Sequence, residues 1–151
     1  MTERISLEQC RKILRAEATE AQIQDAIIQY LRVQRIPHTI TEAKRSYNER
    51  GQLVRRIAPG WPDITGCARG GKLLAVECKS AKGRLSPDQA RTLYGLIQAG
   101  ALVVVARSVD CVIEILRTGC IRERDIEEIA RYKDKPIKTQ PRSIVRKRRA
   151  L

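Results

Sequence analysis

Two carboxylates and an ammonium group stand close together in the middle of the chain. Asp63 follows a Gly, a Trp and a Pro, while Glu77 and Lys79 end an apolar run. Alternate side chains of a strand share a face, so Glu77 and Lys79 would lie side by side. A Gly-Gly turn between the two segments would bring Asp63 next to Glu77. Such carboxylates repel unless a cation lies between them, and an oxygen-rich pair suits Mg²⁺ or Mn²⁺.

Four segments occur here in a particular order. They are Pro62-Asp63, Glu77-Cys78-Lys79, the run from Gly83 to Gln89, and an Ala-Gly pair followed by the apolar run 101–106. This ordered set resembles the PD-(D/E)XK nuclease superfamily, most closely its VRR-NUC (virus-type replication-repair nuclease) domains, from about Thr19 to Leu116. The resemblance implies an α/β fold with a restriction-endonuclease-like core, a central mixed β-sheet flanked by helices.

The resemblance also implies roles for individual residues. Asp63 and Glu77 would hold one Mg²⁺ or Mn²⁺, with the main-chain carbonyl of Cys78 as a further ligand. Lys79 would orient the attacking water or stabilise the developing oxyanion. Glu20 and Gln89 would form the supporting shell of the catalytic group, and no small-molecule cofactor is expected.

Two helices would position these supporting side chains. Residues 19–35 form the first, with a Thr19–Gln22 capping box and an apolar face made of Ile23, Ala26, Ile27, Tyr30 and Leu31. Glu20 borders that face, so it is either exposed in the first turn or aimed at the site. The second helix begins at Ser86-Pro87. There, Gln89 is explained either as a capping residue or as a group beside the metal.

The remaining elements follow from periodicity. We expect a leading helix over 1–17, strands over 38–43, 52–57, 64–67 and 72–79, and a buried strand over 101–106 parallel to the central one. Residues 108–117 form a short helix or a final strand. Residues 122–133 form a helix whose apolar stripe is Ile126, Ile129 and Ala130. The expected domains are an N-terminal helical extension (1–18), the nuclease domain (19–132) and a basic, disordered tail (133–151).

The charge of the chain favours a polyanionic partner. There are 30 basic against 17 acidic residues, a formal net charge of +13, which speeds association with nucleic acid. The candidate DNA contacts lie before the Asp63 loop, after Lys79 and in the tail: Arg55, Arg56, Lys82, Arg84, Arg146, Lys147, Arg148 and Arg149. The alternative is that the arginine pair is simply solvated and that the tail is a solubilising segment.

Other classes fit the sequence poorly. The five cysteines are scattered and there is one histidine, which is not the pattern of a zinc site and is typical of reduced thiols. The N-terminus is polar, and the longest apolar run is too short to cross a bilayer. We therefore expect no membrane association and a cytoplasmic location, in a bacterial or phage-infected cell.

These observations together predict a metal-dependent, structure-specific DNA endonuclease. By resemblance, small members of this family act on branched DNA as homodimers, so a four-way (Holliday) junction in DNA repair or recombination is the expected substrate. General nicking or flap cleavage is the alternative within the class. A catalytically idle nucleic-acid-binding module is the alternative of another class, against which the intact Asp63, Glu77 and Lys79 argue.

Overall fold

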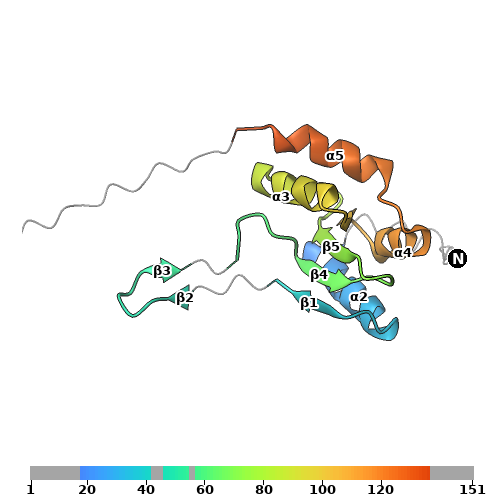
Figure 1. Cartoon of the computed structure of the whole chain (residues 1–151), viewed down its shortest axis with the longest axis horizontal. Helices are drawn as coiled ribbons and strands as arrows, with labels where there is room; N and C mark the ends of the chain where they lie inside the picture. Colours follow the sequence, from blue (N-terminus) through green and yellow to red (C-terminus); the bar gives the residue numbers. More distant parts are fainter. Residues whose placement is uncertain (1–17, 42–45, 55–56, 137–151) are drawn as a thin grey trace, which may run out of the picture.

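A four-stranded mixed sheet forms the centre of the molecule (Figure 1). The computed structural model describes residues 18–41, 46–54 and 57–136. The strand order is β1 (His38–Ile40), β4 (Ile64–Cys67), β5 (Leu73–Cys78) and β6 (Leu102–Ala106). Strand β4 pairs antiparallel with both β1 and β5, and β6 runs parallel to β5. The predicted mixed sheet and its parallel final pair are confirmed.

Helices cover both faces of this sheet. On one face, α2 (Glu20–Val33) and α4 (Val109–Thr118) bury Ile27 and Ile115 against Val76. On the other, α3 (Pro87–Gln98) and α5 (Glu123–Lys133) bury Leu93 and Ile129 against Ala75. Figure 1 shows the two pairs on opposite sides of the strands. Strand β5 thus feeds both cores through alternate side chains, as its sequence predicts.

The crossover between the two parallel strands is the helix α3. Ser86 accepts a hydrogen bond from the amide of Gln89, and Pro87 opens the helix, so the predicted start is confirmed. At its other end Gly100 has a φ of +92°, a left-handed conformation that suits glycine. The unit returns the chain so that β6 lies beside β5.

Several details of the helical faces differ from the sequence prediction. In α2 the buried residues are Ile23, Ile27, Ile28 and Leu31, whereas Ala26 is exposed. Residues 108–117, ambiguous in sequence, are the helix α4. In α5 the predicted stripe was right only at Ile129: Ile126 is 46% exposed and Ala130 is exposed, while Asp125 is buried with Ile129. A charged residue occupies this core position because it has a buried ion partner, described below.

The strands before Asp63 are shorter than predicted. Residues 38–40 form β1, and a separate two-stranded hairpin pairs β2 (Ser46–Tyr47) with β3 (Leu53–Val54). The predicted leading helix, Arg55, Arg56 and most of the basic tail lie outside the described residues. Within the described part, no helix is long and apolar enough to cross a membrane.

Candidate active site

Asp63 and Glu77 meet at one edge of the sheet. The pairing of Ile64 with Val76 sets the register, so the last residues of β5, Glu77 and Cys78, lie beside Asp63, which precedes β4. Asp63 Oδ2 accepts a hydrogen bond from the main-chain amide of Cys78 at 2.7 Å. The juxtaposition expected from the Gly-Gly turn is therefore what the structure contains.

The loop before Asp63 is held against the first turn of α3. Gly60 has a φ of +77°, and a Cβ there would lie only 2.4 Å from the main-chain carbonyl of Asp88. Thr92 Oγ1 also donates to the carbonyl of Pro59 at 3.3 Å. Only glycine permits this close approach in this conformation. The loop thus brings Asp63 and the helix carrying Gln89 into one site.

Glu77 is a buried carboxylate with unequal oxygens. It is 1% exposed. Oε1 accepts a hydrogen bond from Gln89 Nε2 at 2.5 Å and lies 3.2 Å from Lys79 Nζ. Oε2 is buried and has no hydrogen-bond partner among the described residues. A buried acceptor without a partner is costly, so this oxygen is suited to a ligand that the protein itself does not supply.

Burial makes this group of carboxylates hard to ionise. The pKa of Glu77 rises from 4.5 to about 7, mainly through burial and then through the negative charge of Asp63, while Lys79 opposes the rise. Burial also raises the pKa of Asp63, against the hydrogen bond from Cys78. A bound cation would reverse these costs, because it favours the ionised form of both groups.

Gln89 makes a capping contact and a contact with Glu77 at the same time. Its Oε1 accepts from the amide of Ser86 at 2.9 Å, which completes the capping box of α3. Its Nε2 donates to Glu77 at the same time. The capping geometry therefore fixes the amide so that its donor end faces the carboxylate.

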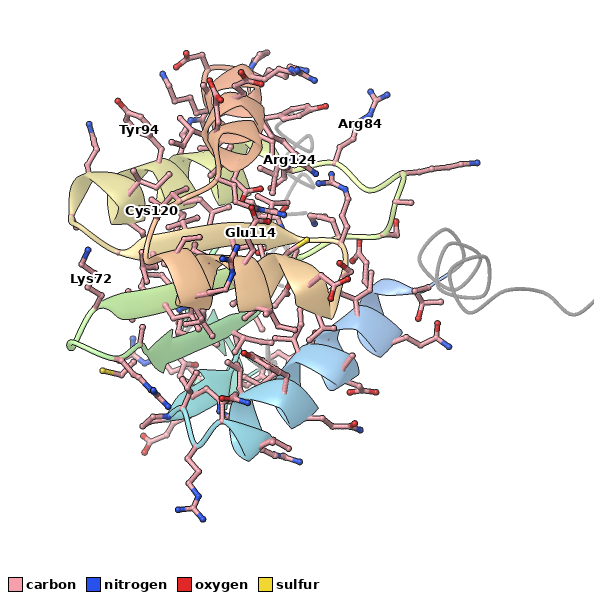
Figure 2. All side chains as sticks on the ribbon, turned by 90° about the vertical axis from the view of Figure 1, so that its right-hand side faces the viewer. Lys72, Arg84, Tyr94, Glu114, Cys120 and Arg124 are labelled. Carbon is pink, nitrogen blue, oxygen red and sulfur yellow. The ribbon has the colours of Figure 1, made fainter. Side chains whose placement is uncertain are left out.

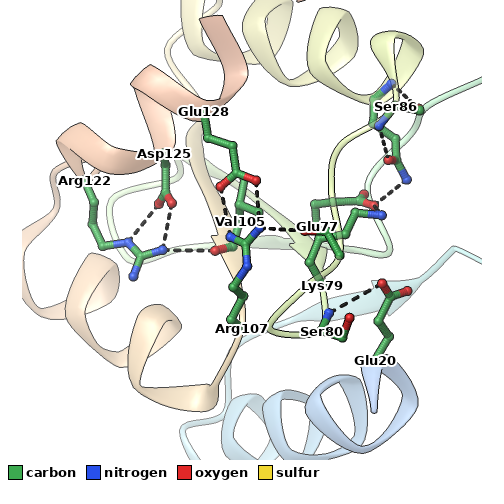
Figure 3. Close-up of polar contacts among 12 residues, drawn as sticks. Glu20, Glu77, Lys79, Ser80, Ser86, Val105, Arg107, Arg122, Asp125 and Glu128 are labelled. Atoms are coloured by element: carbon green, nitrogen blue, oxygen red, sulfur yellow. Dashed lines mark hydrogen bonds and ion pairs between the residues drawn. The ribbon is translucent and has the colours of Figure 1, made fainter. Parts of the chain in front are cut away.

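Glu20 lies in the first turn of α2, and its Oε1 faces the loop that follows Lys79. It accepts from the amide of Ser80 at 3.4 Å (Figure 3). A Cβ at Gly83 would lie 3.0 Å from the same oxygen. Its charge contributes to raising the pKa of both Asp63 and Glu77. Glu20 is thus exposed, as one alternative predicted, and also faces the site, as the other did.

The chemistry of this donor set fits a hard divalent cation. Among the described residues no group of three or more His, Cys, Asp or Glu side chains could hold a metal. The metal ligands predicted from the sequence are not such a group of three side chains, because they are two carboxylates and a main-chain carbonyl. The amide of Cys78 points to Asp63, and the amide and carbonyl of one strand residue point to the same side. The Cys78 carbonyl therefore faces Asp63 as well, and Glu77 Oε2 offers a second buried oxygen.

The structure shows further basic residues near this edge. Lys82 and Arg84, predicted from sequence, are exposed on the loop that follows Lys79. Arg107, Arg124 and Arg131 come close to them and were not identified from sequence. A signal existed for Arg107, because it directly follows β6, and the carboxyl ends of parallel strands meet at the same edge as Glu77. No comparable signal marked the arginines of α5.

A mixed sheet covered by helices, with two carboxylates and a lysine gathered at one edge, defines a PD-(D/E)XK-type nuclease core. The chain matches the VRR-NUC domain family over residues 6–110 and belongs to that family. It is therefore a nuclease of the PD-(D/E)XK type, a class that generally uses divalent metal ions and acts on nucleic acid. Comparison with curated proteins and with solved structures finds no match.

Proposed function

We propose that this nuclease is an Mg²⁺- or Mn²⁺-dependent endonuclease that hydrolyses phosphodiester bonds in DNA. The observation that carries the proposal is the buried Oε2 of Glu77, which lies near Asp63 and has no hydrogen-bond partner in the described part of the chain. A carboxylate pair near a phosphate is unfavourable for a protein that only binds nucleic acid, because it repels the ligand. The same pair is useful when a cation neutralises it.

Asp63, Glu77 and the carbonyl of Cys78 would hold the ion. The ion supplies charge neutralisation at the phosphate and a water of lowered pKa. Gln89 donates to Oε1 of Glu77, so Oε2 would be available to bind the ion. Glu20, on the neighbouring helix, adds negative charge at the open side.

Lys79 is the residue best placed to act on the reacting atoms. Its Nζ lies 3.2 Å from Glu77 Oε1, and its side chain is 10% exposed. A buried ammonium donates strongly to an oxyanion, because the local dielectric constant is low. We assign to Lys79 the orientation of the attacking water or the stabilisation of charge that develops on the phosphate.

Branched DNA, and the four-way junction in particular, is the substrate that we propose. This choice rests on the resemblance to small, stand-alone members of the family. A homodimer would supply two active sites for the two strands of a junction. General nicking or flap cleavage is the alternative within the same activity.

The proposed nuclease domain runs from residue 19 to 132. In support of including α5, this helix packs on α3 as part of the second core. Arg91 also donates to the carbonyls of Lys133 at 2.9 Å and Lys135 at 2.7 Å, just beyond the proposed end. The family match begins at residue 6, inside the proposed N-terminal extension. The functions of the extension and of the basic tail remain proposals, as DNA-binding or partner-binding segments.

The test is a cleavage assay on labelled four-way junctions, flaps, linear duplexes and single strands, with Mg²⁺, Mn²⁺ or EDTA. Lys79→Ala is the control, and light scattering gives the oligomeric state. Paired, symmetric cuts in the junction alone, absent in EDTA and in the control, would establish a dimeric junction nuclease. Cuts in several substrates would keep the endonuclease and remove the junction preference. Binding without cuts under any condition would favour the idle binding module.

A further inference from the structure

A basic groove lies between the loop of residues 80–84 and helix α5. Its volume is about 540 Å³, and it is open to solvent. Five basic side chains line it against two acidic ones, the basic ones being Lys82, Arg84, Arg107, Arg124 and Arg131. We call it the α5 groove. Figure 2 shows Arg84 and Arg124 on the same side of the molecule, with Lys72 on the opposite side.

The α5 groove is joined to the catalytic edge by short contacts. The amide of Lys79 donates to the carbonyl of Ala106 at 3.0 Å, and Arg107 is the next residue. Arg107 donates to both carboxylate oxygens of Glu128 on α5, at 2.9 and 2.7 Å, and to the carbonyl of Gly83 at 2.8 Å (Figure 3). One arginine therefore ties α5 to the loop that follows Lys79 and fixes both walls of the groove.

Arg107 and Glu128 neutralise each other, so the charge that the groove offers to a ligand comes from its other residues. The other four bases are exposed, and no ion pair between described residues involves them. Glu127 is then the one acidic side chain of the lining that is not in such a pair. The groove therefore presents a surplus of accessible positive charge, and the loop that directly follows Lys79 forms one of its walls.

The spacing of the cations indicates an extended anion. Arg124 and Arg131 are seven residues apart on α5, two turns of helix, or about 10 Å along one face. Side chains that far apart do not converge readily on one small anion, whereas they can contact separate phosphates of one strand. Arg84 faces them from the opposite wall. A groove with cations on both walls suits a single polyanionic backbone that passes between them.

We propose that the α5 groove binds the phosphate backbone of the substrate strand beside the bond that is cut. This inference rests on the proposed function and extends it by naming the path of the strand. Arg124 and Arg131 act as binding residues, and Arg107 acts as a positioning residue. The family match ends at residue 110, so one wall comes from the shared nuclease core and the other from the segment beyond that match.

The experiment measures DNA binding by the full-length chain in EDTA, so that cleavage does not interfere. A fluorescently labelled duplex and a labelled four-way junction are titrated by anisotropy between about 50 and about 200 mM salt.

The groove variant is Arg124→Gln with Arg131→Gln, two exposed positions. The matched control is Arg69→Gln with Lys72→Gln, which removes the same charge from exposed positions at the far end of β5, roughly 20 Å from the site. Lys82→Gln with Arg84→Gln tests the opposite wall without touching α5.

Both groove variants should bind about tenfold or more weakly, and the slope of log K against log salt should become shallower by about 1 to 2, since two phosphate contacts are lost. The control should stay within about twofold of the parent, as expected when its charges touch no phosphate. Groove variants that bind as well as the parent would overturn the inference, as would a control that loses as much.

Cleavage by the unaltered protein is scored separately. If it cuts nothing while binding depends on the groove, the proposed function fails and the groove stands. If it cuts DNA while binding is independent of the α5 groove, the inference about the groove fails and the proposed function stands.

Discussion

Glu77 and Asp125 are both 1% exposed, yet their surroundings differ in a way that separates a reactive carboxylate from a structural one. Asp125 accepts from Arg122 at both oxygens, at 2.8 and 2.7 Å, and Arg122 also donates to the carbonyl of Val105 (Figure 3). Glu77 has Gln89 and Lys79 on one oxygen and no partner among the described residues on the other. A fully paired buried carboxylate holds a helix in place, whereas a half-paired one is open to a ligand.

Burial raises the pKa of both carboxylates, but the neighbouring charges act on them in opposite directions. For Asp125 the next influence is its bond with Arg122, which lowers the pKa. For Glu77 it is the like charge of Asp63, which raises the pKa further, to about 7. A bidentate arginine therefore neutralises a buried carboxylate from within the protein. A second acid keeps the site dependent on an external cation.

Glu77→Gln should produce the largest change in activity. It keeps the shape of the side chain and removes the charge that would hold the ion, so cleavage should fall by about a thousandfold or more. The free energy of unfolding in EDTA should stay the same or rise, because an unfavourable buried charge has gone. Cleavage rates and thermal melts of the same preparation measure both. Retention of cleavage within about tenfold of the parent would remove Glu77 from the metal site.

Asp63→Ala is the companion change at the other carboxylate. It should abolish cleavage but leave DNA binding intact or tighter, because a charge that repels phosphate is lost. Cleavage gels and anisotropy titrations give the two readouts. Joint loss of binding and cleavage would count against a catalytic assignment and indicate a damaged site.

Asp125→Ala should show the opposite behaviour. Removing Asp125 takes away both hydrogen bonds between Arg122 and a buried carboxylate, which should cost about 3 kcal/mol of unfolding free energy. Cleavage by the folded fraction should survive within about tenfold, since Asp125 lies outside the reacting group. Denaturant melts measure the loss, with the exposed Glu123→Ala on the same helix as the control, expected within about 0.5 kcal/mol of the parent. A loss as small as that of the control would show that the pair contributes nothing.

The pH dependence of stability should report the raised pKa of Glu77. The pKa of Glu77 is about 7 in the folded chain and 4.5 ordinarily. Because the folded value is the higher one, its protonation stabilises the fold fully below about pH 4.5, and this stability is lost as the pH rises through about 7. As the pH is raised from 5 to 8 in EDTA, the temperature of thermal unfolding should therefore decrease in the parent relative to Glu77→Gln. Parallel curves for the two proteins would contradict the raised pKa.

Gln89→Glu should give the smallest effect, and the chain supplies its own control. Gln22 and Gln89 both complete capping boxes, with Thr19 and Ser86 respectively, but only Gln89 also donates to Glu77. A glutamate still accepts the capping hydrogen bond at either position, and it suits the positive helix N-terminus. Gln89→Glu should slow cleavage by about tenfold through the added like charge, while Gln22→Glu should not. Equal rates for the two variants would reduce Gln89 to a capping residue.

Much of this organisation is readable from local pattern. The capping boxes of α2 and α3 depend on residues three apart, and the alternation of β5 depends on neighbours along one strand. Both were therefore predicted correctly. The predicted apolar stripe of α5 was right only at Ile129. The position of apolar residues cannot show that Asp125 is buried, because its burial depends on an ion pair with Arg122, the residue just before the helix. Ala26 was misplaced because small residues carry little information about which way a face points.

By itself, the sequence determined the order of the core elements, the type of each except α4, and the group of Asp63, Glu77 and Lys79, since these follow from periodicity and from short, ordered motifs. Only the tertiary structure decided which oxygen of Glu77 is left without a partner, that Gln89 both caps a helix and holds that carboxylate, and that α5 faces the loop after Lys79. The reason is physical: these features depend on how segments far apart in the chain pack across the sheet. Packing is set by the shape and pairing of many side chains at once, and no local spacing records it.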